Sequence, residues 1–259
     1  MSNKPESHEP EPEQLAEGTL MSHLLELRSR LMKAVLAVVV VFLCLAPFTQ
    51  RVFEAVSAPL IAVLPEGAEM IATDVASPFL TPFKTAFFVA IYIAMPVVLF
   101  QVWQFVAPGL YRHEKRFALP LMLSSIVLFY AGIAFAYFVV FRVMFTFFAQ
   151  SIPGGVQMTP DISAYLSFVL GIFLAFGLAF EVPIATVMLI WSGLVSIKTL
   201  KSIRPYVFLG AFVVGMLLAP DVFSMTLMAI PMYLLYECGL IMARFMLPEK
   251  TTSAEKTAS

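Results

Sequence analysis

Charge is scarce in this sequence. Asp, Glu, Lys and Arg together make up 13% of its 259 residues, about half of the roughly 25% that is usual in soluble domains. The net charge is −1, so there is no basic excess of the kind that nucleic-acid binding requires. The two cysteines are too few for a disulfide-rich scaffold. These shortages exclude a nucleic-acid-binding protein and a disulfide scaffold.

Motifs for catalysis and for nucleotide binding are absent as well. The chain has no H-E-x-x-H metalloprotease motif and no G-x-x-x-x-G-K-[ST] phosphate-binding loop. Its three histidines, His8, His23 and His113, all lie outside the apolar runs, so none is placed to partner a serine or to ligate haem within a helical bundle. We therefore expect no catalytic residue, no metal ligand, no cofactor and no enzymatic activity.

Hydrophobic residues are what the sequence has in excess. They make up 60% of the chain and include 25 phenylalanines, which a surface in contact with water would not tolerate. About 20 apolar residues in a helix cross the hydrocarbon layer of a bilayer, and the chain holds several runs of this length. It is predicted to be an all-α, multi-pass membrane protein.

The few charged residues divide the apolar sequence into spans. The last apolar stretch, Pro205–Ala243, is too long for one crossing and carries a turn signal at Ala219-Pro220-Asp221, so we divide it there. Its first part would be a helix only ~22 Å long. We expect six transmembrane helices, with helices five and six short, inside a membrane domain of residues 21–247 flanked by disordered tails 1–20 and 248–259. The six expected spans are 31–49, 83–108, 117–149, 162–191, 205–219 and 222–243.

The positive charges predict the orientation. With the N-terminus inside, 13 of the 16 Lys and Arg residues fall in inner segments, and only Arg51, Lys84 and Arg142 fall outside or near an outer helix end. Lys and Arg accumulate in cytoplasmic loops, so both termini are expected in the cytoplasm. Arg142 lies near the outer end of the third span, and its side chain is expected to extend toward the outer surface.

Among the acidic residues in or beside the last three spans, Glu181 and Asp221 are the most informative. Glu181 is well inside the fourth span and Pro183 follows it, which predicts a kink there. A carboxylate at this depth needs a proton or a partner, and two roles remain open: a structural hydrogen bond, or a polar point on a transport path or partner contact. Asp221 lies in the turn before the sixth span and is predicted to cap it.

Two further acids belong to the cytoplasmic segments. Glu26 and Arg30 are four residues apart in an amphipathic helix, a spacing that predicts an ordinary ion pair. Glu114 stands among the basic neighbours Arg112, His113, Lys115 and Arg116, and by composition alone a solvated, self-neutralised loop is the favoured interpretation.

From about Met21 to Phe245 the chain closely resembles the TatC family, the largest subunit of the bacterial twin-arginine protein translocase. The resemblance is carried by an ordered series of segments, which are His23–Leu31, Ser57–Leu60, Ile71–Phe79, Gln101–Arg116, Phe135–Phe138, Tyr165–Phe168, Phe180–Pro183 and Arg204–Leu218. Six spans with both ends inside is also the topology of that family.

The resemblance implies that the chain is a receptor at the cytoplasmic face of the bacterial cytoplasmic (inner) membrane. It would bind the twin-arginine signal peptides of folded precursor proteins through Glu26 and Glu114, flanked by Arg28 and Phe105. A carboxylate accepts a guanidinium through two parallel hydrogen bonds, which lysine cannot reproduce. The implied partners are single-span subunits of the TatA and TatB types, other copies of the chain and the lipid bilayer, and the implied energy source is the proton motive force.

The resemblance also suggests roles for residues elsewhere in the chain. Glu181 matches a polar position in a concave, membrane-facing surface, and our hypothesis is that it acts with the short spans to thin the bilayer nearby. The chain departs from the family pattern at two points in the turn before the sixth span. Met225 stands where the pattern has glutamine, and one proline rather than two precedes Asp221. An alternative function is a proton-coupled small-solute carrier that uses Glu181, although we find none of the internal repeats typical of carriers. Residues expected to contact partners or to support the structure are Pro59, Asp74, Tyr137, Asp221 and Met225.

Overall fold

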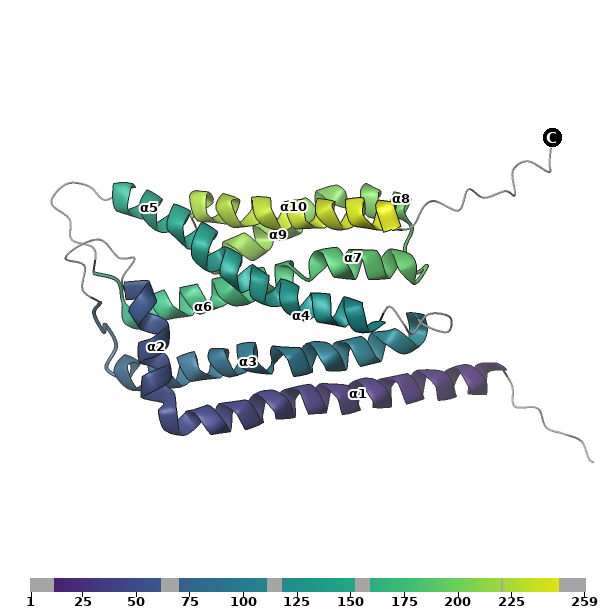
Figure 1. Ribbon diagram of the computed structural model, residues 1–259, viewed down its shortest axis with the longest axis horizontal. Coiled ribbons are helices and arrows are strands. Elements are labelled where there is room, and N and C mark those ends of the chain that lie inside the picture. Colours follow the sequence, from purple (N-terminus) through teal and green to yellow (C-terminus); the bar gives the residue numbers. More distant parts are fainter. Residues whose placement is uncertain (1–11, 62–69, 111–117, 152–158, 220, 247–259) are drawn as a thin grey trace, which may run out of the picture.

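The computed structural model describes residues 12–61, 70–110, 118–151, 159–219 and 221–246, and they form a helical bundle (Figure 1). Within these ranges the only extended pairing is a single β-bridge between Ile71 and Asp161. Five helical segments are long and apolar enough to cross a membrane, and Arg204–Leu218 is a shorter apolar helix. The all-α membrane fold predicted from the sequence is confirmed. The five long segments are Leu24–Ala58, Ser77–Phe105, Leu119–Phe148, Ile162–Trp191 and Val222–Phe245.

The helices lie mainly along one axis of the molecule (Figure 1). Helices α1, α3, α6, α7 and α10 follow this axis, the α4–α5 rod crosses it obliquely, and α2 lies across one end. The elements are α1 (Pro12–Leu45), η1 (Ala46–Phe48), α2 (Thr49–Ile61), α3 (Ser77–Leu110), α4 (Ala118–Phe135), η3 (Ala136–Val140), α5 (Phe141–Ser151), α6 (Ile162–Ala179), α7 (Val182–Trp191), α8 (Ile197–Ser202), α9 (Arg204–Leu218) and α10 (Val222–Met246).

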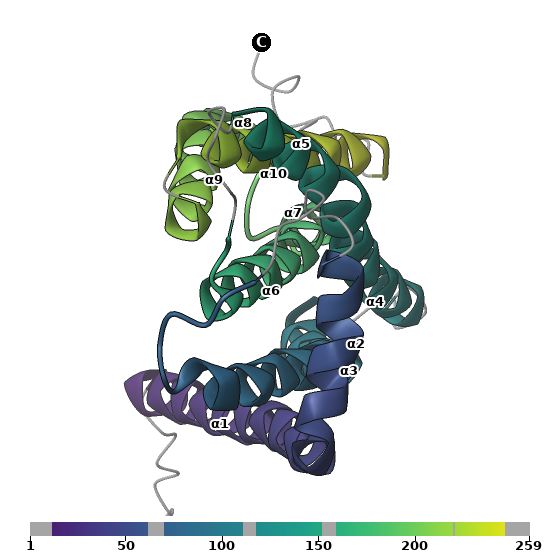
Figure 2. The ribbon, with the colours of Figure 1, turned by 90° about the vertical axis from the view of Figure 1, so that its left-hand side faces the viewer.

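The start of α1 and the end of α10 lie at the same end of the bundle, which we call the terminus end (Figure 1). Helix α2 lies at the opposite end, which we call the far end. Seen from the far end, α1 and α3 form one side, α9 and α10 lie on the other, and α6 runs between them (Figure 2). The helices therefore form a broad layer rather than a closed ring.

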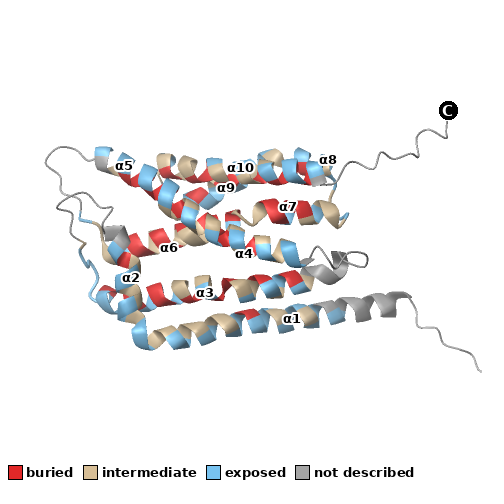
Figure 3. Cartoon of the chain, viewed as in Figure 1, coloured by how far each residue is buried: buried red, intermediate tan, exposed pale blue. Residues whose placement is uncertain are grey.

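Buried side chains gather where α6 meets the α4–α5 rod and α10 (Figure 3). Phe176 of α6 and Phe129 of α4 are fully buried. Gly132 allows the close crossing of these helices, because a Cβ at that position would collide with the backbone carbonyl of Phe176. Many large apolar side chains remain exposed on α1, α3 and α9, as expected for surfaces that face lipid rather than water.

The helix boundaries differ from the expected spans at the two ends of the chain. Helix α1 begins at Pro12, so residues 12–20, expected in a disordered tail, are helical. Pro in a first helical turn fits the fixed φ of that residue, and Glu, Gln, Leu and Ala follow it. Helix α10 is not short, because its 25 residues continue past Ala243 to Met246. Arg244 in the last turn does not end the helix, since a cation there interacts favourably with the helix dipole.

The third and fourth spans are each interrupted. One turn of π-helix, η3, joins α4 to α5, and such turns often occur at functional sites. The kink predicted at Pro183 is confirmed, since α6 ends at Ala179 and α7 begins at Val182. Proline has no N–H and clashes with the preceding turn, so the fourth span divides at Phe180 and Glu181.

Candidate functional site

At the terminus end, Arg30 links α1 to α3. Its Nε and Nη2 atoms donate to Glu26 Oε1 at 2.9 and 2.5 Å, and its Nη1 atom donates to Gln104 Oε1 of α3 at 2.5 Å. The ion pair that the four-residue spacing predicts is therefore present. The Arg30 side chain is 19% exposed and the Glu26 side chain 37% exposed. Arg30 holds one oxygen of Glu26 and anchors it to the neighbouring helix.

Of the other residues expected at this end, the structure describes Arg28 and Phe105 but not Glu114. Arg28 is exposed on α1 and makes no ion pair with the part of the chain that the structure describes. Phe105 is half-buried on α3, directly after Gln104. Glu114 lies outside the described residues, so its position relative to Glu26 is not part of the described geometry. Sequence reasoning did not single out Gln104, which was visible only as a polar residue near the end of an apolar run.

In the interior, Glu181 lies at the break between α6 and α7. Its Oε2 atom accepts a hydrogen bond from the hydroxyl of Ser125 on α4. Its Oε1 atom is buried and has no hydrogen-bond partner among the described residues. The helix break thus places a half-buried carboxylate against a single neutral donor. Sequence reasoning did not identify Ser125, whose one signal was its polarity, shared with Ser124, within a largely apolar helix.

Asp221 and Met225 lie where α9 turns back into α10. Asp221 Oδ1 accepts a 2.7 Å hydrogen bond from the backbone N–H of Ser224, which confirms the predicted helix cap. The backbone of Met225 lies against Gly215 of α9, where a Cβ would be 2.9 Å from the Met225 carbonyl oxygen. At the other end of this helix pair, Arg204 Nη2 donates to Glu237 Oε2 at 2.5 Å. The α9–α10 hairpin is therefore held at both ends.

At the far end, the segment after residue 70 is joined to the start of α6. Thr73 donates from its backbone N–H and its hydroxyl to Asp161 Oδ2 at 3.0 and 2.7 Å. The Ala164 N–H donates to Asp161 Oδ1 at 2.8 Å. These bonds, the Thr73 N–H first among them, lower the pKa of Asp161 from 3.8 to about 2. Sequence reasoning used Asp161 only as a span boundary.

Three more residues were expected to contact partners or to support the structure, namely Asp74, Tyr137 and Pro59. Asp74 is exposed, and its backbone carbonyl accepts the Ser77 N–H at 3.2 Å. Tyr137 lies in η3 and packs against Phe138 with 4.9 Å between ring centroids. Pro59 is within α2, but its side chain is outside the described part. Among the described residues, no three His, Cys, Asp or Glu side chains converge as a metal site requires.

Comparison with known proteins identifies the family. The model of the family described as "Sec-independent protein translocase protein (TatC)" matches residues 22–231. The chain is 58% identical over 241 residues to the Sec-independent protein translocase protein TatC of Azotobacter chroococcum mcd 1, covering 93% of this chain and 92% of that one. It is 57% identical over 227 residues to the protein of the same name from Escherichia coli strain K12, covering 87% and 88%.

Solved structures agree with this result. A crystal structure described as the twin-arginine translocase receptor TatC superposes with a TM-score of 0.79 at 38% identity, covering 86% of this chain and 98% of that one. A second, of the same protein type in the detergent DDM, gives 0.78 at 39% identity. The resemblance predicted from the sequence is confirmed. The chain belongs to the TatC family and is a multi-pass bacterial membrane protein, a component of the twin-arginine protein translocase.

Proposed function

We propose that this chain is the receptor that binds twin-arginine signal peptides of folded precursor proteins, with Glu26 and Glu114 as the two acids that accept the two arginines. The observation that carries the proposal is that the Glu26 carboxylate is held in place and is still accessible to solvent. Arg30 occupies Oε1 from one side, while the side chain remains 37% exposed. An incoming guanidinium can therefore still reach the carboxylate without displacing a buried partner.

Arg30 acts in this proposal as a positioning residue. It ties Glu26 to Gln104 of α3, so that the carboxylate is held on a rigid helix pair before a ligand arrives. A pre-oriented acceptor loses less conformational entropy on binding. Phe105, directly beside Gln104, would pack on the apolar part of the signal peptide. Arg28, exposed two residues from Glu26, would tune the local charge, and Glu114 would approach from the segment after α3.

We also propose the topology and partners that this role requires. The terminus end would face the cytoplasm, so both termini would be cytoplasmic, in the cytoplasmic membrane. The positive-charge distribution supports this orientation. Single-span subunits of the TatA and TatB types and other copies of the chain would assemble with it, and the proton motive force would drive transport. The crystal structure named as a twin-arginine translocase receptor supports the receptor role. Members of this family are translocase components, and we propose no catalysis.

Peptide binding to the detergent-solubilised protein tests the proposal. A labelled peptide with an Arg-Arg pair is compared with its Lys-Lys twin, for the unchanged chain and for Glu26→Gln and Glu114→Ala. We expect the Arg-Arg peptide to bind about tenfold or more tightly, because a bidentate charged hydrogen bond is worth about 1.5–3 kcal/mol. Each acid substitution should remove most of this preference.

Glu54→Gln is the matched control, because Glu54 is an exposed acid on α2 at the far end. It should leave the preference for arginine unchanged. Equal binding of the two peptides by the unchanged chain, or full preference retained in both acid variants, would contradict the assignment of Glu26 and Glu114.

A second candidate function, the proton-coupled small-solute carrier, is favoured by one observation. The buried Oε1 atom of Glu181 has no partner in the described part of the chain, as a proton-binding carboxylate would require. A carrier would move a solute when reconstituted alone in vesicles with a proton gradient, and Glu181→Gln would stop it. The receptor proposal expects no solute movement by the chain alone.

A further inference from the structure

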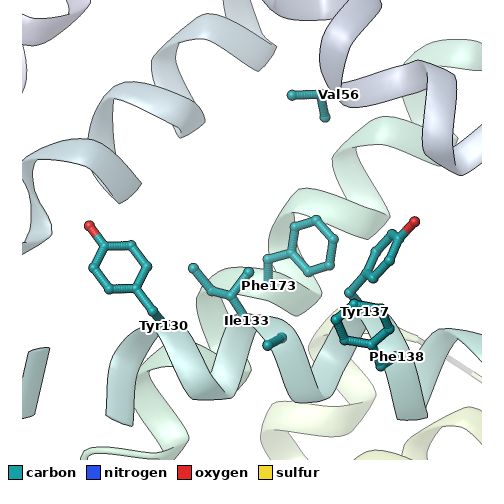
Figure 4. A pocket seen from close by; sticks show the side chains of 7 residues that line it. Val56, Tyr130, Ile133, Tyr137, Phe138 and Phe173 are labelled. Carbon is teal, nitrogen blue, oxygen red and sulfur yellow. The ribbon is translucent and has the colours of Figure 1, made fainter. Parts of the chain in front are cut away.

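A cavity of about 340 Å³ opens on the side of the bundle between α2, the α4–η3 rod and α6. We call it the side pocket. Figure 4 shows Tyr130, Ile133, Tyr137 and Phe138 along one wall, Phe173 at the back and Val56 of α2 opposite. Its volume falls within the roughly 300–1,000 Å³ of small-molecule sites. The residues that line it are apolar or aromatic, and they are Val56, Tyr130, Ile133, Ala134, Tyr137, Phe138 and Phe173.

The walls of the side pocket are held in place by local structure. The Tyr130 hydroxyl donates to the Tyr92 carbonyl of α3 at 2.9 Å, which fixes one side wall. The π-turn η3 presents two consecutive aromatic rings, and Tyr137 packs at 6.4 Å from the Phe173 ring as well as on Phe138. Phe138 is 68% exposed and Tyr130 41% exposed. The pocket is therefore preformed and open toward the surroundings of the bundle.

Arg142 lies four residues after Phe138, one helical turn closer to the far end. Its side chain is exposed, and no carboxylate pairs with it among the described residues. A cation inside a membrane-spanning helix is costly unless it finds a partner or reaches the interface. Among the described residues, an unpaired guanidinium thus lies one helical turn beyond Phe138, an exposed residue of the pocket wall.

We propose that the side pocket binds one phospholipid, with an acyl chain between the aromatic walls and the phosphate on Arg142. The pocket matches the apolar chain, and the guanidinium matches the phosphate, which it can bind through two parallel hydrogen bonds. The ligand comes from the leaflet at the far end, since Arg142 lies on that side of the pocket. This site is at the opposite end of the bundle from Glu26 and does not depend on the signal-peptide proposal.

Native mass spectrometry of the detergent-solubilised full chain tests the site, with dioleoylphosphatidylglycerol as the probe. Three variants are compared with the unchanged chain. Arg142→Gln removes the phosphate partner, Ala134→Trp fills the pocket, and Lys84→Gln is the control. Lys84 is also exposed near the far end, but it donates to Ser167 on α6 at 2.6 Å and does not line the pocket.

We expect one tightly bound lipid on the unchanged chain and on the Lys84→Gln variant. Binding should weaken about tenfold or more in Arg142→Gln, as loss of a charged hydrogen-bond pair implies, and also in Ala134→Trp. Dioleoylglycerol, which has the same chains without a phosphate, should bind the unchanged chain and Arg142→Gln equally. Arg-Arg peptide binding should be unchanged in Arg142→Gln, which separates this site from the receptor proposal.

Equal lipid binding by the unchanged chain and Arg142→Gln would overturn the proposal, as would a loss of the same size in Lys84→Gln. Thermal unfolding of each variant shows whether it is folded. Should Ala134→Trp fail to fold, the comparison of Arg142→Gln with Lys84→Gln decides the question, because both replaced side chains are exposed.

Discussion

The hydroxyl of Ser125 on α4 donates a hydrogen bond to a carboxylate oxygen of Glu181, which lies at the break between α6 and α7. Among the described residues, this is the one hydrogen bond that the half-buried carboxylate accepts, because its second oxygen has no partner there. It joins two residues of neighbouring spans that are 56 positions apart in the sequence. The pair is therefore a polar link between two spans across the apolar interior.

Replacing Ser125 with alanine should destabilise the bundle. The carboxylate would lose its donor, and an unsatisfied buried polar group costs about 1–3 kcal/mol. The midpoint of thermal unfolding in detergent should fall for Ser125→Ala. Ser124→Ala is the matched control, because among the described residues the Ser124 hydroxyl donates to the Leu121 carbonyl of its own helix and to no other span. A Ser124→Ala variant as unstable as Ser125→Ala would show that the Glu181 bond is not the cause.

Asp161 should make the thermal stability of the chain depend on pH in the acidic range. Its pKa in the folded chain is lowered to about 2, from an ordinary value of 3.8. A lowered pKa means that the stabilisation is present above the ordinary pKa and is lost as the pH falls through the folded value. The unfolding midpoint of the unchanged chain should exceed that of Asp161→Asn at pH 7, and the two should converge between about pH 4 and pH 2.

Asp74→Asn serves as the control for this measurement. Asp74 is exposed and close in sequence to Thr73, but Asp161 rather than Asp74 accepts the Thr73 bonds. The Asp74 variant should unfold at the same midpoint as the unchanged chain throughout the pH range. A constant difference between the unchanged chain and Asp161→Asn at every pH would show that the Asp161 charge is not responsible.

Gly215 should tolerate no side chain, whereas Gly210 on the same helix should. A Cβ at Gly215 would lie 2.9 Å from the Met225 carbonyl oxygen, while a Cβ at Gly210 has no atom within 4 Å. Gly215→Ala should lower stability by about 1–3 kcal/mol, because the α9 and α10 backbones must separate. Gly210→Ala should be neutral or stabilising by up to about 1 kcal/mol. Equal shifts of the unfolding midpoint in Gly215→Ala and Gly210→Ala would show that close packing of α9 on α10 does not explain the glycine at position 215.

The length of α9 should matter for transport but not for peptide binding. Its 15 residues extend only ~22 Å, less than the ~30 Å of hydrocarbon in a bilayer. Inserting four apolar residues between Val207 and Phe208 preserves the Gly215 contact and brings the helix near full length. If the short helix thins the membrane, this variant should lose precursor transport in vesicles while Arg-Arg peptide binding is kept.

The insertion also moves Arg204 away from Glu237, so Arg204→Gln is the control that breaks only this ion pair. It should retain transport that the insertion variant loses. Normal transport by the lengthened variant would refute the thinning hypothesis.

Much of the fold follows from local rules that the sequence carries by itself. A helix in hydrocarbon must satisfy its backbone internally and be apolar along its length, so the spans can be read from composition. Pro183 breaks its own helix through the ring and the missing N–H, and four-residue spacing pairs Glu26 with Arg30. Asp221 caps the helix that follows it. Each of these interactions lies within a few residues of the chain, and each is confirmed.

Other features were decided only by tertiary structure. Ser125 and Glu181, Gln104 and Arg30, and Thr73 and Asp161 are pairs far apart in sequence. Which polar residues meet depends on how neighbouring helices cross and rotate, and periodicity cannot specify that in a span that is apolar on all sides. The side pocket has the same origin, since a π-turn and the docking of α2 create it. The sequence determined that the chain spans a membrane, that its fourth span breaks before Pro183 and which local pairs form, whereas helix packing determined which side chains of different spans meet.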